Sequence, residues 1–273
     1  MVRLAYLGPP GTFTEEAALR YQASAQLAPC ASEVAVASAV ESGDANEGVL
    51  AIENSVEGSV VRTLDILIHE TQLVIRRELI LPIEHCLIVR PGMSAGDVRA
   101  IYSHPHTFGQ CRHYLERRFP KATLEASLSN AAAVQEILGL DGAAAIGPAR
   151  AAELHGAQLL ERGIQDYAHN KTRFVVLGKE DSAPTGNDKT SIALTVAHDK
   201  PGTLVGVLHE FADRGINLTK IESRPSREEL GIYVFLIDLE GHRSEPVVAE
   251  ALTRVEAQAQ FFRVLGSYAR FDA

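Results

Sequence analysis

Hydroxyl, amide and guanidinium side chains stand where short apolar runs of the sequence begin or end. Thr172 and Arg173 precede the run 174–177, and they offer a hydroxyl together with a permanent cation suited to bidentate recognition of a carboxylate. Asn54 and Ser55 follow another apolar run, and Asn54 can both donate and accept hydrogen bonds. Ligands of α/β sheets bind at the carboxyl ends of strands, so these positions are candidates for a binding site.

Ser103 and Gln110 lie on either side of a turn that contains Pro105. If a helix begins just after this turn, Gln110 lies in its first turns and can converge with Ser103 on one ligand. An ideal strand points Thr172 and Arg173 to opposite faces, so both reach the same ligand only where the backbone is irregular.

Helix starts supply the remaining candidates. Segment 8–14 reads Gly-Pro-Pro-Gly-Thr-Phe-Thr, in which the glycines allow close backbone approach and Thr12 or Thr14 can cap a helix, leaving backbone N–H groups for an anion. Ser59 can cap the next predicted helix. Each segment also reads as an ordinary turn with a helix cap. The lysine of a phosphate-binding loop is missing from 8–14, so nucleotide binding is not predicted.

Metal and nucleophilic chemistry are not indicated. His104, His106 and His113 lie close together in the sequence, but their spacing completes no recognised metal-binding pattern. No Ser/His/Asp, Cys/His or paired-carboxylate arrangement has a recognisable spacing. The residues alone predict a cleft with hydroxyls, amides and one arginine, which suits anion binding or acid-assisted elimination and does not choose between them.

Composition narrows the class of protein. The 273-residue chain has 35 acidic and 26 basic residues, a formal charge of −9, and no run of Lys or Arg, which argues against a nucleic-acid-binding surface. Three widely spaced cysteines indicate thiols in a reducing compartment. No apolar run approaches the ~18 residues of a membrane span, so we expect a cytoplasmic protein without membrane contact.

Short apolar runs alternate with amphipathic stretches over the first two thirds of the chain, which is the pattern of parallel α/β units. Strand-like stretches near 75–85 and 158–172 predict that the chain crosses into a second lobe and returns. We therefore expect a two-lobed α/β domain over 1–182, with a cleft between its lobes. Polar residues 183–188 form a linker, and 189–273 reads β-α-β-β-α-β, the ferredoxin-like unit.

Four groups of motifs follow one another along the chain: Gly8-Pro9-Pro10-Gly11-Thr12-Phe13, Glu53-Asn54-Ser55 with Gly58-Ser59-Val60 and Thr63-Leu64-Asp65, Ser103-His104-Pro105 with Gln110-Cys111, and Thr172-Arg173-Phe174. In this order and spacing they resemble prephenate dehydratase, over essentially the whole chain. The C-terminal unit is similar to an ACT regulatory domain. Its segments Gly202-Thr203-Leu204-Val205 and Glu222-Ser223-Arg224-Pro225 match the two that bind phenylalanine in that family. Thr203 and Asn130 stand where the family usually has Ala and Thr, and no role is assigned to position 130.

The resemblance implies conversion of prephenate to phenylpyruvate with loss of carbon dioxide and water, in phenylalanine biosynthesis and without a metal or other cofactor. It implies a catalytic domain similar to periplasmic-binding-protein-like folds. Thr172 is implied to donate or relay the proton, while Arg173 holds the pyruvyl carboxylate. The other implied contacts are Asn54, Ser103 and Gln110, which orient the substrate, and Thr12, Phe13, Ser55, Ser59 and Phe174, which bind it.

The ACT domain implies feedback control by L-phenylalanine and a homodimer or homotetramer. Because the first strand starts at residue 2, we expect a monofunctional enzyme without a preceding chorismate mutase segment. Two other functions stay open. One is a dehydratase acting on arogenate, the aminated substrate; the other is a non-catalytic amino-acid-binding sensor on the same two-lobed fold, which the retained Thr172-Arg173 pair disfavours.

Overall fold

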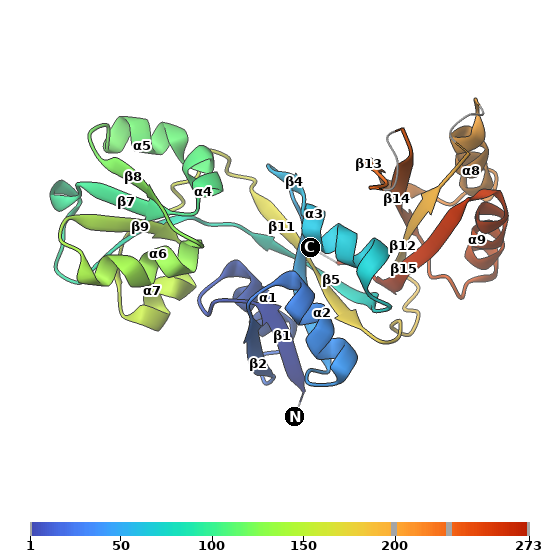
Figure 1. Ribbon diagram of the computed structural model, residues 1–273, viewed down its shortest axis with the longest axis horizontal. Coiled ribbons are helices and arrows are strands. Elements are labelled where there is room, and N and C mark those ends of the chain that lie inside the picture. The colour runs from blue at the N-terminus through green and yellow to red at the C-terminus, as the bar shows by residue number, and fades with distance from the viewer. Residues whose placement is uncertain (1, 198–200, 228–230, 272–273) are drawn as a thin grey trace. The chain divides into compact units, whose positions relative to one another are not determined.

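The computed structural model describes residues 2–197, 201–227 and 231–271. These residues form two compact units (Figure 1). Unit 1 consists of Met1–Val61 and Leu79–Phe174, and unit 2 of Arg62–Glu78 and Val175–Ala273. Among the described residues, no helix has the length and apolar character needed to cross a membrane.

The first lobe of unit 1 is a small parallel sheet. Strand β1 (Arg3–Leu7) lies in the middle and pairs in parallel with β2 (Gln26–Cys30) and β3 (Glu47–Asn54). Helices α1 (Phe13–Tyr21) and α2 (Glu33–Ser42) connect these strands (Figure 1). A two-residue strand, β4 (Gly58–Ser59), folds back on the end of β3 as a hairpin. Residues 13–27 read as one amphipathic helix in the sequence, but α1 ends at Tyr21 because residues 26–30 pair with β1 instead.

The second lobe holds a five-stranded sheet in the order β10-β6-β9-β7-β8. The strands are β6 (Cys86–Val89), β7 (Ala100–Ser103), β8 (Thr123–Ala126), β9 (Ala143–Gly147) and β10 (Gln158–Arg162). The helices are α4 (Pro105–Gln110), α5 (Arg112–Arg118), α6 (Asn130–Glu136) and α7 (Ala149–His155), with short 3-10 turns η2 (Ala95–Asp97) and η3 (Ile137–Gly139).

Both faces of this sheet are covered. Leu87 and Val89 pack in a cluster with residues of α5, while Cys86 and Ile88 pack in a second cluster with residues of α6 and α7. This alternation is the period of two of an extended strand, and it explains why all four residues of β6 are apolar and buried.

Two strands connect the lobes with the rest of the chain. Strand β5 (Val74–Pro82) leads into the second lobe, and β11 (Lys171–Gly178) leads out of it. The backbone N–H of Ile83 donates to the carbonyl of Asn170 at 2.9 Å, so the two connections are hydrogen-bonded to each other.

Unit 2 contains the C-terminal β-α-β-β-α-β unit expected from the sequence. Its elements are β12 (Asp188–Thr195), α8 (Thr203–Ala212), β13 (Leu218–Pro225), β14 (Tyr233–Glu240), α9 (Pro246–Gln258) and β15 (Phe261–Ala269). The sheet runs β13-β14-β12-β15, and a cluster around Phe211 and Leu252 packs α8 and α9 against it. Helix α3 (Val61–Asp65), the π-helical turn η1 (Ile66–Glu70) and the start of β5 belong to the same unit. The α/β class with a ferredoxin-like unit is therefore confirmed.

Candidate active site

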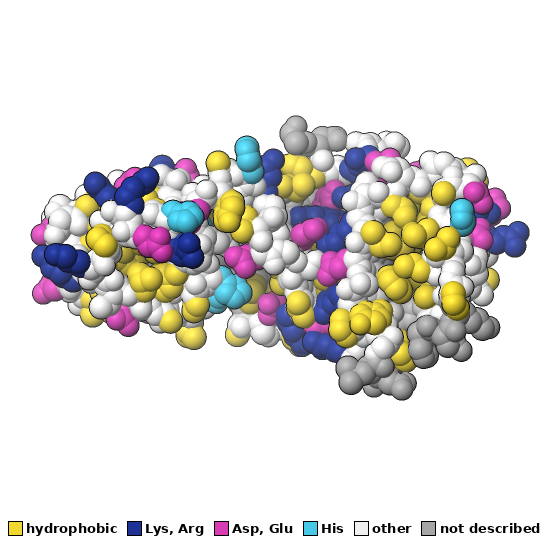
Figure 2. Space-filling model, turned by 90° about the horizontal axis from the view of Figure 1, so that it is seen from above, with side chains coloured by type: hydrophobic (Ala, Val, Ile, Leu, Met, Phe, Trp, Pro, Cys, Tyr) yellow, Lys and Arg dark blue, Asp and Glu magenta, His cyan; other side chains and the backbone are white. Residues whose placement is uncertain are grey.

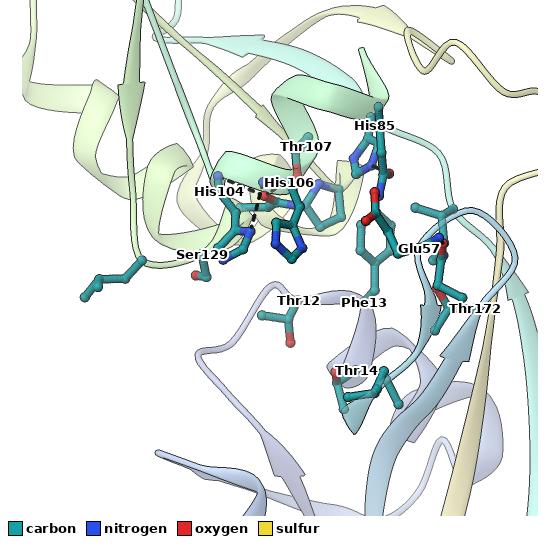
Figure 3. A pocket seen from close by; sticks show the side chains of 18 residues that line it. Thr12, Phe13, Thr14, Glu57, His85, His104, His106, Thr107, Ser129 and Thr172 are labelled. Atoms are coloured by element: carbon teal, nitrogen blue, oxygen red, sulfur yellow. Dashed lines mark hydrogen bonds between the residues drawn. The ribbon is translucent and has the colours of Figure 1, made fainter. Parts of the chain in front are cut away.

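A cavity of about 330 Å³ lies in unit 1, where residues of both lobes meet (Figure 3). Helix starts, strand ends and the β3–β4 hairpin all contribute side chains. The lining residues are Thr12, Phe13, Thr14, Ala51, Asn54, Glu57, Val60, Ile83, His85, His104, His106, Thr107, Gln110, Leu128, Ser129, Asn130, Pro148 and Thr172. No group of three His, Cys, Asp or Glu side chains in the described part of the chain is arranged to hold a metal ion.

Thr172 is oriented by Asn54. The amide nitrogen Nδ2 of Asn54 donates to Thr172 Oγ1 at 2.9 Å, and its oxygen Oδ1 accepts from the backbone N–H groups of Val56 and Glu57, both at 2.9 Å. Backbone N–H groups only donate, so the two branches of the amide are distinguished without ambiguity. Thr172 Oγ1 is therefore an acceptor in this contact, and its hydroxyl hydrogen is left for another partner.

A chain of amides continues from Asn54 to His85. Asn54 Nδ2 also donates to Asn170 Oδ1 at 2.8 Å, and Asn170 Nδ2 donates to Gln110 Oε1 at 2.9 Å. His85 Nε2 lies 2.8 Å from the same oxygen, while Gln110 Nε2 donates to Glu57 Oε1 at 3.1 Å. Gln110 Oε1 can only accept, so the proton of His85 is on Nε2.

His85 is held in its neutral form. The residue is 2% exposed, its ring packs edge-on against Phe13 with centroids 5.6 Å apart, and Nδ1 is buried without a partner among the described residues. Burial lowers the pKa of His85 below its ordinary value, because an imidazolium here would be cut off from water. Its Nε2–H donor therefore persists, and with Asn170 it fixes which way the Gln110 amide points.

Three helices begin at this cavity and form what we call its helix-start wall. The hydroxyl of Thr12 caps α1 by accepting from Glu15 N–H at 3.3 Å, and the hydroxyl of Ser129 caps α6 by accepting from Ala132 N–H at 3.0 Å. His104 caps α4 through Nδ1, which accepts from His106 N–H at 3.4 Å. Helix N-termini carry partial positive charge. Among the lining residues described, none is Lys or Arg, so attraction for an anion comes from these helix starts and from neutral donors.

Five of the ten catalytic and substrate-binding residues expected from the sequence line this cavity: Thr12, Phe13, Asn54, Gln110 and Thr172. Arg173 does not. Strand β11 is regular at this point, so Arg173 points away from Thr172 and lies with Nη1 3.6 Å from Glu53 Oε2. Arg173 therefore does not line the cavity beside Thr172, and its contact with the substrate stays a prediction.

Four further residues expected to contact the ligand do not line this cavity either. Ser103 is fully buried, and its hydroxyl hydrogen is shared between Ile146 O at 2.8 Å and Asn130 Oδ1 at 3.1 Å. Ser55 is occupied by His169 O and Lys171 N–H, and Phe174 is 2% exposed in the core. Ser59 pairs with Glu53 in β4 and does not begin α3.

Sequence reasoning missed several lining residues, chiefly Glu57, His85, Thr107 and Asn130. The Pro at the start of α4 and the Ser that caps α6 were usable signals for Thr107 and Asn130, because both lie in the first turn of a helix. His85 lies in the irregular segment between β5 and β6, where no periodicity exists to place it.

A second cavity, of about 390 Å³, lies in unit 2. Gly202, Thr203, Leu204 and Val205 line it together with Val196, Ala197, Gly231, Tyr233 and Phe235. Gly202 has a φ of 88°, a left-handed conformation that favours glycine, and it begins α8. The residues Glu222, Ser223, Arg224 and Pro225 lie on β13 and are not among the lining residues.

Arg224 has a different partner. Its Nη2 donates to Asp65 Oδ1 at 2.8 Å, and Arg227 bonds the other oxygen of the same carboxylate. The Asp65 side chain is 3% exposed and that of Arg224 is 12% exposed, so this ion pair is largely shielded from water.

Comparison with known proteins identifies both parts of the chain. A family model described as prephenate dehydratase matches residues 4–182, and the ACT domain model matches residues 191–257. The bifunctional chorismate mutase/prephenate dehydratase of Aquifex aeolicus is 42% identical over 98% of this chain and 73% of its own length. The prephenate dehydratase of Mycobacterium tuberculosis is 41% identical over 98% of this chain and 87% of its own. The crystal structure of prephenate dehydratase from Arthrobacter aurescens in complex with L-Phe superposes with a TM-score of 0.91, at 37% identity, covering 98% of this chain and 90% of that one.

Proposed function

The chain belongs to the prephenate dehydratase family, and on that premise we propose that it converts prephenate to phenylpyruvate, carbon dioxide and water, under control by L-phenylalanine. The observation that carries the proposal is the Thr172 hydroxyl, held in the cavity by the Asn54 amide. This pair gives the cavity a positioned hydroxyl whose oxygen already accepts a hydrogen bond.

The chemistry matches what these residues supply. The C–C bond to the ring carboxylate breaks, its electron pair makes the ring aromatic, and the C–O bond to the ring hydroxyl breaks with that oxygen leaving as water. The leaving oxygen needs one proton, which Thr172 donates or relays. A threonine hydroxyl is a weak acid, and the Asn54 Nδ2 donor on its oxygen stabilises the negative charge that forms there.

Prephenate carries two carboxylates, and we assign their binding to the helix-start wall of the cavity rather than to Arg173. The first turn of α1 contributes Thr12, Phe13 and Thr14, and the backbone N–H groups of a first turn have no partner within the helix. Gln110 and Asn54 contact the cavity from the other side and orient the ring.

For regulation, we propose that the unit 2 cavity is the phenylalanine site. Gly202 to Val205 line it, Tyr233 and Phe235 offer aromatic surface, and the Arthrobacter aurescens relative was crystallised with L-Phe. Glu222 to Pro225 would complete the site from a second copy or after a rearrangement of β13. We also propose domain limits of 1–182, 183–188 and 189–273 for the catalytic domain, linker and ACT domain, and the family-model matches over 4–182 and 191–257 support them.

A homodimer or homotetramer in the cytoplasm is also part of the proposal. Figure 2 shows hydrophobic side chains gathered on the face of the C-terminal unit that it displays. Val205, Ile221 and Tyr233 of this unit are 55%, 51% and 47% exposed, and β13 forms an edge of its sheet. Apolar side chains beside an unpaired strand edge favour association with a second copy.

The test is turnover by the purified chain. We expect phenylpyruvate from prephenate, followed by its ultraviolet absorbance in base, with suppression by added phenylalanine. Arogenate is assayed in parallel through phenylalanine formation, and a preference for it would change the substrate while keeping the reaction. If neither substrate reacts and phenylalanine still binds, the catalytic proposal is wrong and the amino-acid sensor takes its place.

A further inference from the structure

Asn130, the first residue of α6, has an amide oxygen that accepts three hydrogen bonds. Three groups donate to Asn130 Oδ1: Thr107 Oγ1 at 2.9 Å, Ser103 Oγ at 3.1 Å and the backbone N–H of His104 at 3.2 Å. The three donors come from the end of β7 and the start of α4. An oxygen with three donors is held in one orientation, so the whole side chain is fixed.

The orientation of the other branch follows. The His104 N–H can only donate, so the atom beside it is the oxygen and the NH₂ group is on the opposite branch. Within the described part of unit 1, no acceptor is bonded to Asn130 Nδ2, and this atom is not among the buried polar atoms that lack a partner. The residue lines the cavity, which leaves its two N–H donors to the cavity itself.

The backbone under this side chain is also fixed. A Cβ atom at Gly147 would lie 2.9 Å from the backbone oxygen of Asn130, closer than real Cβ contacts allow. Glycine at this position lets α6 approach β9 and brings Asn130 to the cavity wall. Sequence spacing gave no role to position 130, whereas the structure makes it the most firmly oriented amide on this wall.

We propose that Asn130 Nδ2 binds the pyruvyl carboxylate of the substrate, with Ser103 and Thr107 as positioning residues that act through it. This inference rests on the proposed function for the identity of the substrate. The cavity has no Lys or Arg among its described lining residues and does have Glu57, so an anion there needs oriented neutral donors.

The pyruvyl carboxylate is the one that fits. The ring carboxylate leaves as neutral carbon dioxide, and a donor bound to it would be lost as its charge disappears. The pyruvyl carboxylate keeps its charge from substrate to product, so a fixed donor can hold it throughout. The assignment also gives buried Ser103 a role: its one hydroxyl hydrogen is shared between Ile146 O and Asn130 Oδ1, so it orients the amide and does not contact the ligand.

The variant Asn130→Asp tests this most directly. An aspartate keeps an oxygen for the three donors but replaces the NH₂ group with a second, charged oxygen. The probe is the product, phenylpyruvate, whose binding is measured by calorimetry and needs no turnover. The comparison ligand is 1-phenylpropan-2-one, in which a methyl group replaces the carboxylate.

We expect Asn130→Asp to weaken phenylpyruvate binding by about 10- to 100-fold, the range for a hydrogen bond to a charged group, and to leave the ketone unchanged. KM for prephenate should rise by a similar factor while kcat falls less, because the contact persists through the reaction. Asn46→Asp is the matched control, since Asn46 Oδ1 also accepts a backbone N–H, from Arg3 at 2.8 Å, on the exposed surface.

Two results would overturn the inference. The first is an affinity for phenylpyruvate that Asn130→Asp leaves unchanged. The second is an equal loss of affinity for phenylpyruvate and for the ketone, which would indicate a reshaped cavity. If Asn130→Asp does not fold, Thr107→Val removes the shortest of the three bonds and should weaken phenylpyruvate binding by a few fold without changing ketone binding. Asn130-dependent phenylpyruvate binding in a chain that does not turn over prephenate would support this inference and reject the proposed function.

Discussion

Replacing Thr172 by valine separates its proposed chemical role from its structural one. Valine has nearly the shape of threonine and replaces only the hydroxyl by a methyl group, so the apolar contacts of position 172, which is 8% exposed, are kept. What disappears is the hydroxyl, both as proton donor in the cavity and as acceptor for Asn54 Nδ2. Thr172→Ser restores the hydroxyl and removes only a methyl group.

The two losses differ in size. Asn54 Nδ2 keeps Asn170 Oδ1 at 2.8 Å as an acceptor, so Thr172→Val should cost about 1 kcal/mol of stability, a shift of roughly 2–4 °C in Tm. Loss of a positioned acid lowers rates by roughly 10²- to 10⁴-fold, equivalent to about 2.7–5.4 kcal/mol of transition-state stabilisation. The activity loss should therefore exceed the stability loss by a wide margin.

The assay is steady-state turnover of prephenate, with thermal unfolding measured on the same samples. For Thr172→Val we expect kcat to fall at least 100-fold with little change in KM. For Thr172→Ser we expect kcat to stay within about tenfold of the wild-type value. Asn54→Asp keeps the oxygen that caps the hairpin but removes the donor to Thr172. If Asn54 acts through Thr172, combining the two changes lowers kcat no further than Thr172→Val alone. A kcat for Thr172→Val within threefold of the wild type refutes the assignment.

Three further predictions concern stability. Because burial lowers the pKa of His85 from its ordinary value of 6.5, the unfolded chain binds a proton there that the folded chain does not. The free energy of unfolding should therefore fall as the pH drops below 6.5. His85→Gln should lessen that fall in urea titrations, and equal pH slopes would contradict it. Asp65→Asn should lower the free energy of unfolding by about 2–4 kcal/mol, measured by thermal unfolding, because it leaves the 12%-exposed Arg224 side chain without its carboxylate. A decrease of less than about 0.5 kcal/mol would mean that the ion pair is effectively solvated. Gly147→Ala should lower the free energy of unfolding by about 1–3 kcal/mol, because its Cβ would lie too close to the backbone of Asn130. Gly109→Ala is the control, since its Cβ would meet nothing within 4 Å. Equal Tm values for the two variants would refute the packing argument.

Much of the fold could be predicted because its signals are local. Alternating apolar runs gave the α/β class, and the order of strands and helices after residue 188 gave the ferredoxin-like unit. Element ends were less predictable where pairing partners decide them, as at the end of α1, whose continuation joins β1 as the strand β2. Strand alternation indicated that Thr172 and Arg173 face opposite sides, and the structure has them so.

The site itself could be predicted only in part, because its contacts join distant segments. Asn54 and Thr172 are 118 positions apart, and Asn130 meets Ser103 across 27. The spacing of residues along the chain does not show which distant residues are in contact. The family resemblance named the residues of the site, but it did not show how their side chains are oriented.

The orientation of a polar side chain, rather than its residue type, decides whether it can contact a ligand in this cavity. Ser103 and Asn130 belong to one hydrogen-bonded group, yet the sequence favoured Ser103 as the ligand contact and left Asn130 without a role. In the structure the one hydroxyl hydrogen of Ser103 is shared between Ile146 O and Asn130 Oδ1, and the Asn130 amide keeps two N–H donors for the cavity. A buried polar side chain that is fully hydrogen-bonded inside the protein has nothing left for a ligand, so its function must be expressed through the neighbour that it orients.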